Sequence, residues 1–249
     1  MVKKKQVVAI GGGAFSDKPD KLAIERYILA QTAKKKPRVC FLPTASGDAE
    51  TNIQRFYVVF EKLGAAASHV SLFRQERKPA GTLLQNQDVL FVGGGNTRNL
   101  LVLWKEWEIV DVIRRAYAQG TILAGSSAGA MCWFEEGLTD SNPGGFSALT
   151  CLGWLKGSFC PHFDTEPKRK PIFRSMIRSG ELAAGYAVDD GVALHFVNGR
   201  LEHVVSSRPS AGALFLQARD SGLDEASLSP IRLAAPKRST SSQRRRVRQ

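Results

Sequence analysis

Short apolar runs and amphipathic stretches alternate along the first half of the chain. The apolar runs are β-branched or aromatic, and several end in glycine-rich turns, which is typical of buried strands. They predict strands at residues 6–10, 38–42, 70–73, 88–92 and 121–124. The stretches between them have helical spacing and predict helices at residues 20–34, 49–63, 98–107 and 109–118. Strands that alternate with helices favour an α/β fold with a mostly parallel central sheet and helices on both faces.

The pattern changes in the C-terminal third. Strand-like runs occupy residues 153–160, 186–197 and 201–205, and a helix is predicted at residues 171–178. Asp189 and Asp190 interrupt the second run. Asn198-Gly199 is a strong hairpin-turn signal between its end and the third run. We therefore expect a single α/β domain over residues 1–229 whose C-terminal third is more antiparallel.

Charge is unevenly distributed along the chain. The 249 residues carry a formal net charge of +12, and residues 230–249 contain seven basic residues and no acidic one. This segment has few apolar residues and is predicted to be a disordered, solvated tail. Such a tail could contact nucleic acid, but the body has no basic stripe with interleaved aromatic residues, which makes nucleic-acid binding an unfavoured hypothesis.

Composition also limits which cellular compartment and which cofactors are expected. A hydrophobic content of 43% suits one large core, and no apolar run approaches the roughly 20 residues of a membrane-spanning helix. The four cysteines form no CxxC pair and no cluster with histidine, so a zinc site is not predicted. Cys132 and Cys160 are the two that could be reactive, because they lie near the motifs described next. We expect a cytoplasmic protein without metal or organic cofactor.

A glycine-rich turn between residues 121 and 130 carries the first chemical signal. The sequence Gly125-Ser-Ser-Ala-Gly-Ala130 follows a predicted strand and precedes a helix-compatible stretch at residues 130–134. The GxSxG spacing places Ser127 at the apex of a strained turn, where its hydroxyl would act as a nucleophile. The alternative interpretation is an ordinary strand-to-helix turn in which the serines cap the helix.

Two further glycine runs follow predicted strands. Gly93-Gly94-Gly95 precedes Asn96 and a helix, so its backbone N–H groups could hold an oxyanion, or Asn96 could simply cap the helix. Gly11-Gly12-Gly13 matches neither a dinucleotide fingerprint nor a phosphate loop. It indicates a close approach of backbone at the end of the first strand. Strand ends of a parallel sheet meet at one edge, so the Gly93 loop and Ser127 could face the same crevice.

A serine nucleophile needs a general base and a carboxylate that orients it. The chain has four histidines, and only His162 directly follows a predicted strand; His69, His195 and His203 fit structural or exposed roles better. Asp190 is the candidate carboxylate. Asp189, Asp164 and Asp140 remain alternatives, because sequence spacing does not exclude them.

At these residues the chain resembles the peptidase family that includes aspartyl dipeptidase (peptidase E) and, more distantly, cyanophycinase. The matching motifs are the GxSAGA turn at Gly125–Ala130, the VGGGNT loop at Val92–Thr97 and the PHF segment at Pro161–Phe163. They occur in the same order over about four fifths of the chain. The resemblance implies a fold like that of class I glutamine amidotransferases, with serine in place of cysteine at the turn.

The resemblance also implies roles for individual residues. Ser127 would be the nucleophile and His162 the base, with Asp190 where peptidase E has a glutamate. The N–H groups of Gly95 and Ala128 would form the oxyanion hole. The implied substrates are dipeptides with N-terminal aspartate, and the implied enzyme is a monomer or homodimer. Arg169, or Lys168 or Lys170 beside it, would bind the aspartate side chain, although a solvated basic face is the alternative; Asn96 is a second candidate for substrate binding.

Two other functions stay open at this point. An esterase of the α/β-hydrolase type also uses GxSxG, but its order of residues would require Ser127, Asp190 and either His195 or His203. A non-catalytic binding module with the glutamine amidotransferase-like fold is the second alternative. Substitution of His162 separates the peptidase from the esterase, and labelling of Ser127 separates both from the binding module.

Overall fold

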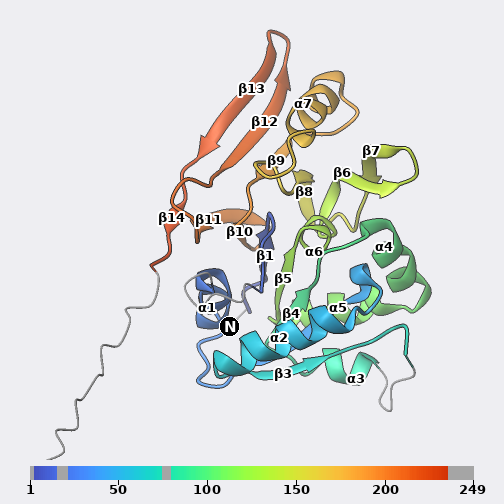
Figure 1. Ribbon diagram of the computed structural model, residues 1–249, viewed down its shortest axis with the longest axis vertical. Coiled ribbons are helices and arrows are strands. Elements are labelled where there is room, and N and C mark those ends of the chain that lie inside the picture. The colour runs from blue at the N-terminus through green and yellow to red at the C-terminus, as the bar shows by residue number, and fades with distance from the viewer. Residues whose placement is uncertain (1–2, 16–21, 75–79, 235–249) are drawn as a thin grey trace, which may run out of the picture.

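Two β-sheets organise the molecule (Figure 1). The computed structural model describes residues 3–15, 22–74 and 80–234. The larger sheet has eight strands in the order β14-β11-β10-β1-β5-β4-β2-β3. These strands are β1 (Gln6–Ile10), β2 (Arg38–Leu42), β3 (Ala66–His69), β4 (Val89–Val92), β5 (Ile122–Ser126), β10 (Val192–Val197), β11 (Arg200–Ser206) and β14 (Ile231–Arg232). The five strands from β1 to β3 in this order run parallel, as predicted, whereas β10 is antiparallel to both its neighbours.

Helices cover both faces of the larger sheet, which confirms the predicted layers. They are α1 (Ala23–Ala30), α2 (Glu50–Lys62), α3 (Ala80–Leu84), α4 (Thr97–Glu106) and α5 (Ile109–Ala118). Successive side chains of a strand point to opposite faces. Accordingly Val8 and Ile10 of β1 pack with α1 and α2, whereas Val7 and Ala9 pack in the cluster that contains α4 and α5. This two-residue alternation explains why the strands read as continuous apolar runs.

The second sheet holds most of the antiparallel pairing in the C-terminal half. It has six strands in the order β13-β12-β9-β8-β6-β7. These strands are β6 (Phe134–Asn142), β7 (Gly145–Thr150), β8 (Leu155–Cys160), β9 (Gly185–Val188), β12 (Ala213–Arg219) and β13 (Gly222–Leu228). Helix α7 (Arg169–Ser179) packs on it, because Phe173 and Ile177 share a buried cluster with Leu216 of β12. The expected antiparallel character is confirmed, but the sequence did not predict a separate sheet.

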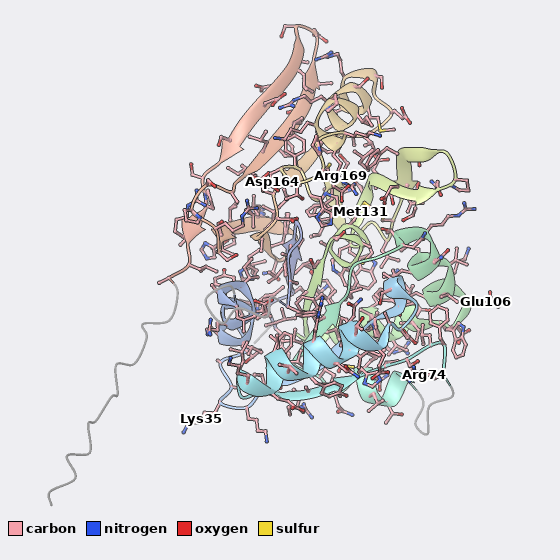
Figure 2. The ribbon with its side chains drawn as sticks, viewed as in Figure 1. Lys35, Arg74, Glu106, Met131, Asp164 and Arg169 are labelled. Carbon is pink, nitrogen blue, oxygen red and sulfur yellow. The ribbon has the colours of Figure 1, made fainter. Side chains whose placement is uncertain are left out.

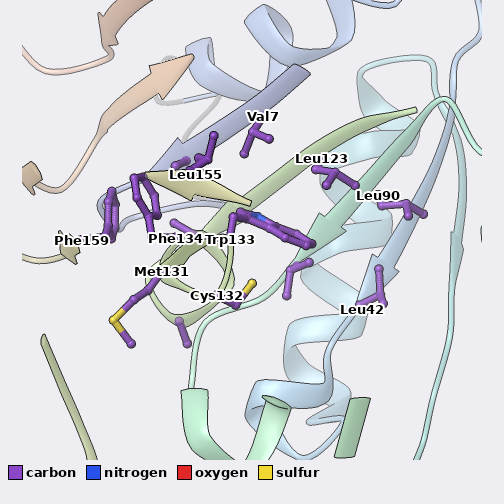
Figure 3. Packing of buried hydrophobic residues seen from close by; sticks show 14 of the residues in the cluster. Val7, Leu42, Leu90, Leu123, Met131, Cys132, Trp133, Phe134, Leu155 and Phe159 are labelled. Carbon is purple, nitrogen blue, oxygen red and sulfur yellow. The ribbon is translucent and has the colours of Figure 1, made fainter. Parts of the chain in front are cut away.

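Apolar side chains join the two sheets. One buried cluster contains Val7, Leu90 and Leu123 of the larger sheet together with Phe134 and Phe159 of the second (Figure 3). All five are at most 1% exposed. Burial of apolar surface stabilises the fold by about 25 cal/mol per Å². The shared cluster therefore holds the two sheets together. No helix in the described part of the chain has the length and hydropathy to cross a membrane.

The predicted strand at residues 70–73 is wrong. The edge strand that pairs with β2 is β3, and the last partner pair of these two strands is Phe41 and His69. Beyond it the chain turns around Asp48, whose carboxylate accepts hydrogen bonds from the N–H groups of Leu72 and Phe73 at 2.8 and 3.0 Å. Val70 and Leu72 are therefore buried by a turn while Phe73 is 54% exposed, and a periodicity argument cannot distinguish this from a strand.

Three other predicted elements differ from the structure by more than two residues at an end, or are divided. The helix at residues 130–134 is the single turn α6 (Ala128–Met131), and Phe134 already begins β6. The run at residues 186–197 is two strands that belong to different sheets, because the chain crosses between them at Asp189 and Asp190. The helix at residues 20–34 is described only from Leu22, and α1 ends at Ala30. Within the expected tail, β14 pairs with β11, and residues 235–249 lie outside the described residues.

Candidate active site

Ser127 lies at the apex of a strained turn between β5 and α6. Its backbone has φ 55° and ψ −117°, outside the regions that a serine ordinarily occupies. The N–H of Ser127 donates to the carbonyl of Ile10 at 3.0 Å, which anchors the turn to β1. Gly125 and Gly129 permit this geometry, because a side chain on Gly125 would overlap the backbone of Gly129, and one on Gly129 would overlap the backbone of Val92. The turn thus has the strained strand-to-helix geometry of a nucleophile elbow, and the Ser127 side chain makes no cap hydrogen bond to α6.

His162 reaches Ser127 from the second sheet. It follows β8 after Pro161 and has φ 53°, and its N–H donates to the carbonyl of Gly11 at 3.1 Å. Its Nε2 lies 2.8 Å from Ser127 Oγ, and its Nδ1 lies 2.7 Å from Asp190 Oδ1. A carboxylate only accepts hydrogen bonds, so Nδ1 carries the proton and Nε2 accepts from the serine hydroxyl. The three side chains form one hydrogen-bonded chain.

Asp190 occupies the crossing from β9 to β10. Its side chain is 23% exposed, similar to the 21% of His162. Its second carboxylate oxygen accepts a hydrogen bond from Thr165 Oγ1 at 3.2 Å. The next residue, Gly191, donates its N–H to the carbonyl of Gly12 at 2.9 Å. The carboxylate is therefore held against the first strand as well as against His162.

The other candidate carboxylates have different partners. Asp189 Oδ2 accepts from the N–H of Gly212 at 2.8 Å, and burial raises the pKa of its carboxyl, with the negative Asp164 adding to this. Asp164 accepts from the N–H of Asp190 and from Arg208. Asp140 lies 3.9 Å from Arg169 and is 62% exposed. The structure brings Asp190, and none of these three, into hydrogen-bond contact with His162.

The histidines that an α/β-hydrolase order would need lie elsewhere. His195 is 2% exposed. Its Nδ1 shares a 2.7 Å hydrogen bond with the hydroxyl of Tyr27, and its Nε2 lies 3.1 Å from Gln6 Oε1. Burial, followed by the neighbouring His203, lowers the pKa of His195 to about 4. His203 of β11 lies opposite His195 of β10 in the strand pair. His195 therefore has a structural hydrogen-bonding role on the face of the sheet that α1 covers.

The glycine loop after β4 lies beside the serine. A Cβ placed on Gly94 would be 3.2 Å from Ser127 Cβ, so the loop backbone runs directly past Ser127. Gly95 has φ 139°, and a side chain there would overlap the carbonyl of Ala45. Asn96 caps α4, because its Oδ1 accepts from the N–H of Asn99 at 2.8 Å, while its Nδ2 donates to the carbonyl of Ser141 at 3.3 Å. Both ends of the Asn96 side chain thus have partners within the protein.

Arg169 is buried, so the expectation of a solvated basic face is wrong for this residue. It is 3% exposed, and its Nε donates to Glu166 Oε2 at 2.7 Å. Its Nη1 donates to the carbonyl of Leu138 at 3.0 Å, and its guanidinium lies 4.9 Å from the ring centre of Phe146. Arg169 and Asp164 both lie in the part of the molecule that the second sheet forms (Figure 2).

The cysteines near the site are protonated at neutral pH. Burial raises the pKa of the Cys160 thiol to about 12 and that of Cys151 to about 12, and it raises the pKa of Cys132 well above its usual range. A thiol nucleophile requires the thiolate form. Among the described residues, no cluster of three or more histidine, cysteine, aspartate or glutamate side chains is arranged to hold a metal ion.

Two contributors to this region were not found by sequence reasoning, and a third was found only in part. Thr165 and Arg208 carry no motif that distinguishes them from surface residues. Gly12 was identified only as part of a close backbone approach, and this is confirmed at Gly11, where a Cβ would meet the backbone of Val188 and Asp189. A Cβ on Gly12 would instead meet His162 and Asp190.

The fold, with a serine at a nucleophile elbow in hydrogen-bond contact with a histidine, is that of a serine hydrolase. The sequence model of peptidase family S51 matches residues 7–204, and the chain belongs to this family of serine peptidases. It is 52% identical over 209 residues to the uncharacterized peptidase YgaJ of Bacillus subtilis, covering 84% of this chain and 90% of that protein. The predicted relationship to the peptidase E family is thereby confirmed.

The chain has two more distant similarities. The chain is 30% identical over 129 residues to peptidase E of Haemophilus influenzae, covering 47% of this chain and 58% of that protein. The crystal structure of a peptidase from an acI-B1 Actinobacterium superposes with a TM-score of 0.73 at 19% identity, over 92% of this chain and 96% of that chain. The second similarity shows that the fold is shared.

Proposed function

We propose that the protein is an exopeptidase that hydrolyses short peptides with a Ser127–His162–Asp190 triad. The observation that carries this proposal is the hydrogen-bonded chain, with 2.8 Å from Ser127 Oγ to His162 Nε2 and 2.7 Å from His162 Nδ1 to Asp190 Oδ1. Membership of a serine peptidase family supports it. The strained backbone of Ser127 gives further support, since strain of this kind recurs at functional residues.

The chemistry is acyl transfer. Ser127 Oγ attacks the scissile carbonyl while His162 Nε2 takes the hydroxyl proton, and His162 then returns this proton to the leaving amine. Water enters, His162 takes one of its protons, and hydrolysis of the ester releases the acyl product and restores the serine. Asp190 keeps the proton on Nδ1 and stabilises the imidazolium that forms in each step.

The oxyanion of each tetrahedral intermediate would be bound by the N–H groups of Gly95 and Ala128. Ala128 follows the nucleophile and opens α6, which is where an elbow supplies its first donor. The passage of the Gly94 backbone close to Ser127 supports the glycine loop as the source of the second donor. Removing one such donor costs about 10²- to 10³-fold in turnover in other serine peptidases.

For the substrate, we propose dipeptides with an N-terminal aspartate. This rests on the resemblance to peptidase E and on Arg169 as the cation for the aspartate side chain. Glu166 already pairs with Arg169, so a substrate carboxylate would compete with Glu166 for the guanidinium. Asn96 is the second proposed substrate contact, and it would have to give up its contact with Ser141.

A dipeptide panel tests the proposal. Wild type and Ser127→Ala should be assayed on Asp-X, Glu-X, Asn-X and neutral dipeptides, and His162→Ala on the best substrate and on a simple ester. We expect Asp-X to be cleaved fastest and both variants to be inactive. Cleavage of no dipeptide by wild type, or equal rates for Ser127→Ala, would refute the peptidase assignment to this site. Ester hydrolysis that survives His162→Ala would favour the esterase.

A further inference from the structure

The main chain of Asp190 is held on both sides by one ion pair. The carboxylate of Asp164 accepts a hydrogen bond from the N–H of Asp190 at 2.9 Å. Arg208 Nη1 donates to the carbonyl of Asp190 at 2.9 Å and to the other oxygen of Asp164 at 2.6 Å. The three residues thus form a closed ring around the peptide groups on either side of the Asp190 Cα. We call Asp164 and Arg208 the clamp.

The segment that carries Arg208 is fitted to the Asp190-Gly191 turn. Ser207 donates from both its N–H and its hydroxyl to the carbonyl of Gly191, at 2.9 and 3.1 Å. Gly191 has φ 72°, and a Cβ there would lie 2.8 Å from Cδ of Arg208. The absence of a side chain at Gly191 therefore lets the Arg208 stem pass over the turn and reach Asp164.

Residues of β14 and the residue after it bind the segment that carries Arg208. Arg232 Nη1 donates to the carbonyls of Arg208 and Ala211, at 2.7 and 2.6 Å, and the N–H of Leu233 donates to the carbonyl of Ser206 at 2.9 Å. Arg208 and Arg232 lie beyond residue 204, where the match to the family model ends. The clamp is therefore completed by the C-terminal part of the chain.

The clamp is charged at neutral pH. Burial alone would favour the neutral acid of Asp164, but the hydrogen bond from the Asp190 N–H and the Arg208 guanidinium outweigh it and lower the pKa of the carboxyl. The side chains of Asp164 and Arg208 are 21% and 40% exposed. A charge-assisted hydrogen bond is roughly twice as strong as a neutral one, so the ring is a rigid support.

A fixed main chain at Asp190 matters for the contact with His162, because the aspartate side chain is short. Asp190 has only two side-chain torsions, so the 2.7 Å contact with His162 Nδ1 depends directly on where the main chain of Asp190 lies. A glutamate, with one more methylene, could adjust by rotation. We propose that Asp164 and Arg208 are positioning residues that fix Asp190 against His162, with Arg232 holding Arg208 in place. This inference rests on the proposed triad.

Arg208→Met is the central variant, because it keeps the stem over Gly191 and removes the donors. We expect kcat to fall about 10- to 100-fold with KM within twofold, since a misplaced orienting group costs turnover and not binding. Arg208→Lys should recover part of the loss. Arg232→Met and Asp164→Asn should show the same kind of loss, smaller for Arg232. Arg219→Met is the matched control, because Arg219 is 57% exposed on the β12–β13 hairpin, and its kcat should equal wild type.

A double-mutant cycle separates positioning from general damage. The rate of labelling by a fluorophosphonate reports the reactivity of Ser127 without requiring a known peptide substrate. Asp190→Ala should slow labelling strongly, and adding Arg208→Met to it should cost less than twofold more, because Arg208 acts through Asp190. Thermal unfolding of every variant identifies loss of fold; if Arg208→Met is unfolded, Arg232→Met and Asp164→Asn complete the cycle.

The outcomes distinguish the two proposals. Labelling that persists in Ser127→Ala, or that is unaffected by Asp190→Ala, overturns the triad. If Asp190→Ala is slow but Arg208→Met labels at the wild-type rate, the triad stands and the clamp is refuted. Losses from Asp190→Ala and Arg208→Met that multiply fully in the double variant also refute the clamp, because they show that Arg208 acts independently of Asp190.

Discussion

Replacing Gly12 with alanine should disable the site while the fold stays intact. A Cβ on Gly12 would lie 2.5 Å from both Cε1 and Nδ1 of His162, and it would overlap Oδ1 of Asp190. These contacts are side-chain atoms of two members of the proposed triad, and no backbone atom is among them. Gly12 does not have a left-handed φ, so alanine introduces no backbone strain of that kind. The methyl group would therefore push the side chains of His162 and Asp190 away from the end of the first strand.

The size of the effect follows from the overlap. Ordinary van der Waals contact begins at 3.4 Å, so the imidazole must retreat from 2.5 Å by about 0.9 Å, and the carboxylate, which is closer to the added Cβ, must move by more. These unequal shifts break the 2.7 Å hydrogen bond between Nδ1 and Asp190. A misplacement of about 1 Å costs about 10²-fold in rate, or about 2.7 kcal/mol of transition-state stabilisation. Complete loss of the orienting carboxylate, about 10⁴-fold in the best-studied triad, sets the upper limit.

The assay combines kcat on the best dipeptide, the rate of fluorophosphonate labelling, and the temperature of unfolding. Gly11→Ala is the matched control, because a Cβ on Gly11 would meet the backbone of Val188 and Asp189 and should lower the unfolding temperature. We expect Gly12→Ala to fold and to unfold about 2–12 °C below wild type, because overpacking a buried position costs about 1–3 kcal/mol and each kcal/mol lowers the unfolding temperature of a chain of this size by about 2–4 °C. Wild-type labelling by Gly12→Ala would refute the assigned geometry.

Three further predictions concern the triad, pH and the core. Asp190→Asn should lower kcat by about 10⁴-fold, because an amide favours the wrong tautomer of His162, and a loss below tenfold in steady-state kinetics would contradict this. Burial lowers the pKa of His195 in the folded state to about 4. As the pH falls below about 6.5, the unfolded state therefore takes up a proton at His195 while the folded state does not. The free energy of unfolding from urea titrations should therefore drop by up to about 3 kcal/mol between pH 7 and 4.5, and less in His195→Gln. Phe56→Ala should cost about 3–5 kcal/mol in the same titrations, because Phe56 is fully buried and stacks on Phe41 at 4.8 Å.

Periodicity predicted the parallel half of the fold well for a physical reason. β1 and β2 are buried on both faces, which gives each a continuous apolar run, and the predicted residues 6–10 and 38–42 equal the observed bounds. Helix α5 also has its predicted bounds, because Gly120 follows it closely and ends the helical pattern. In each case the local signal and the tertiary environment agree.

Periodicity failed where long-range contacts decide the structure. The second sheet begins at Phe134, in a stretch that reads as helix, and it is formed by pairing with β8 more than 15 residues later. Leu72 and Phe73 donate their N–H groups to Oδ2 of a buried carboxylate, Asp48, that is more than 20 residues away. Arg208 likewise reaches Asp164 across 44 residues. No window of neighbouring residues contains these partners.

The site depends on the union of the two sheets. Ser127 follows a strand of the larger sheet, His162 follows a strand of the second, and Asp190 occupies the crossing between them. Gly11 joins the halves, because its carbonyl accepts from His162 while its N–H donates to the carbonyl of Val192. Since the hydrogen-bonded chain spans both sheets, loss of packing between the sheets would separate Ser127 from His162 before either sheet need unfold.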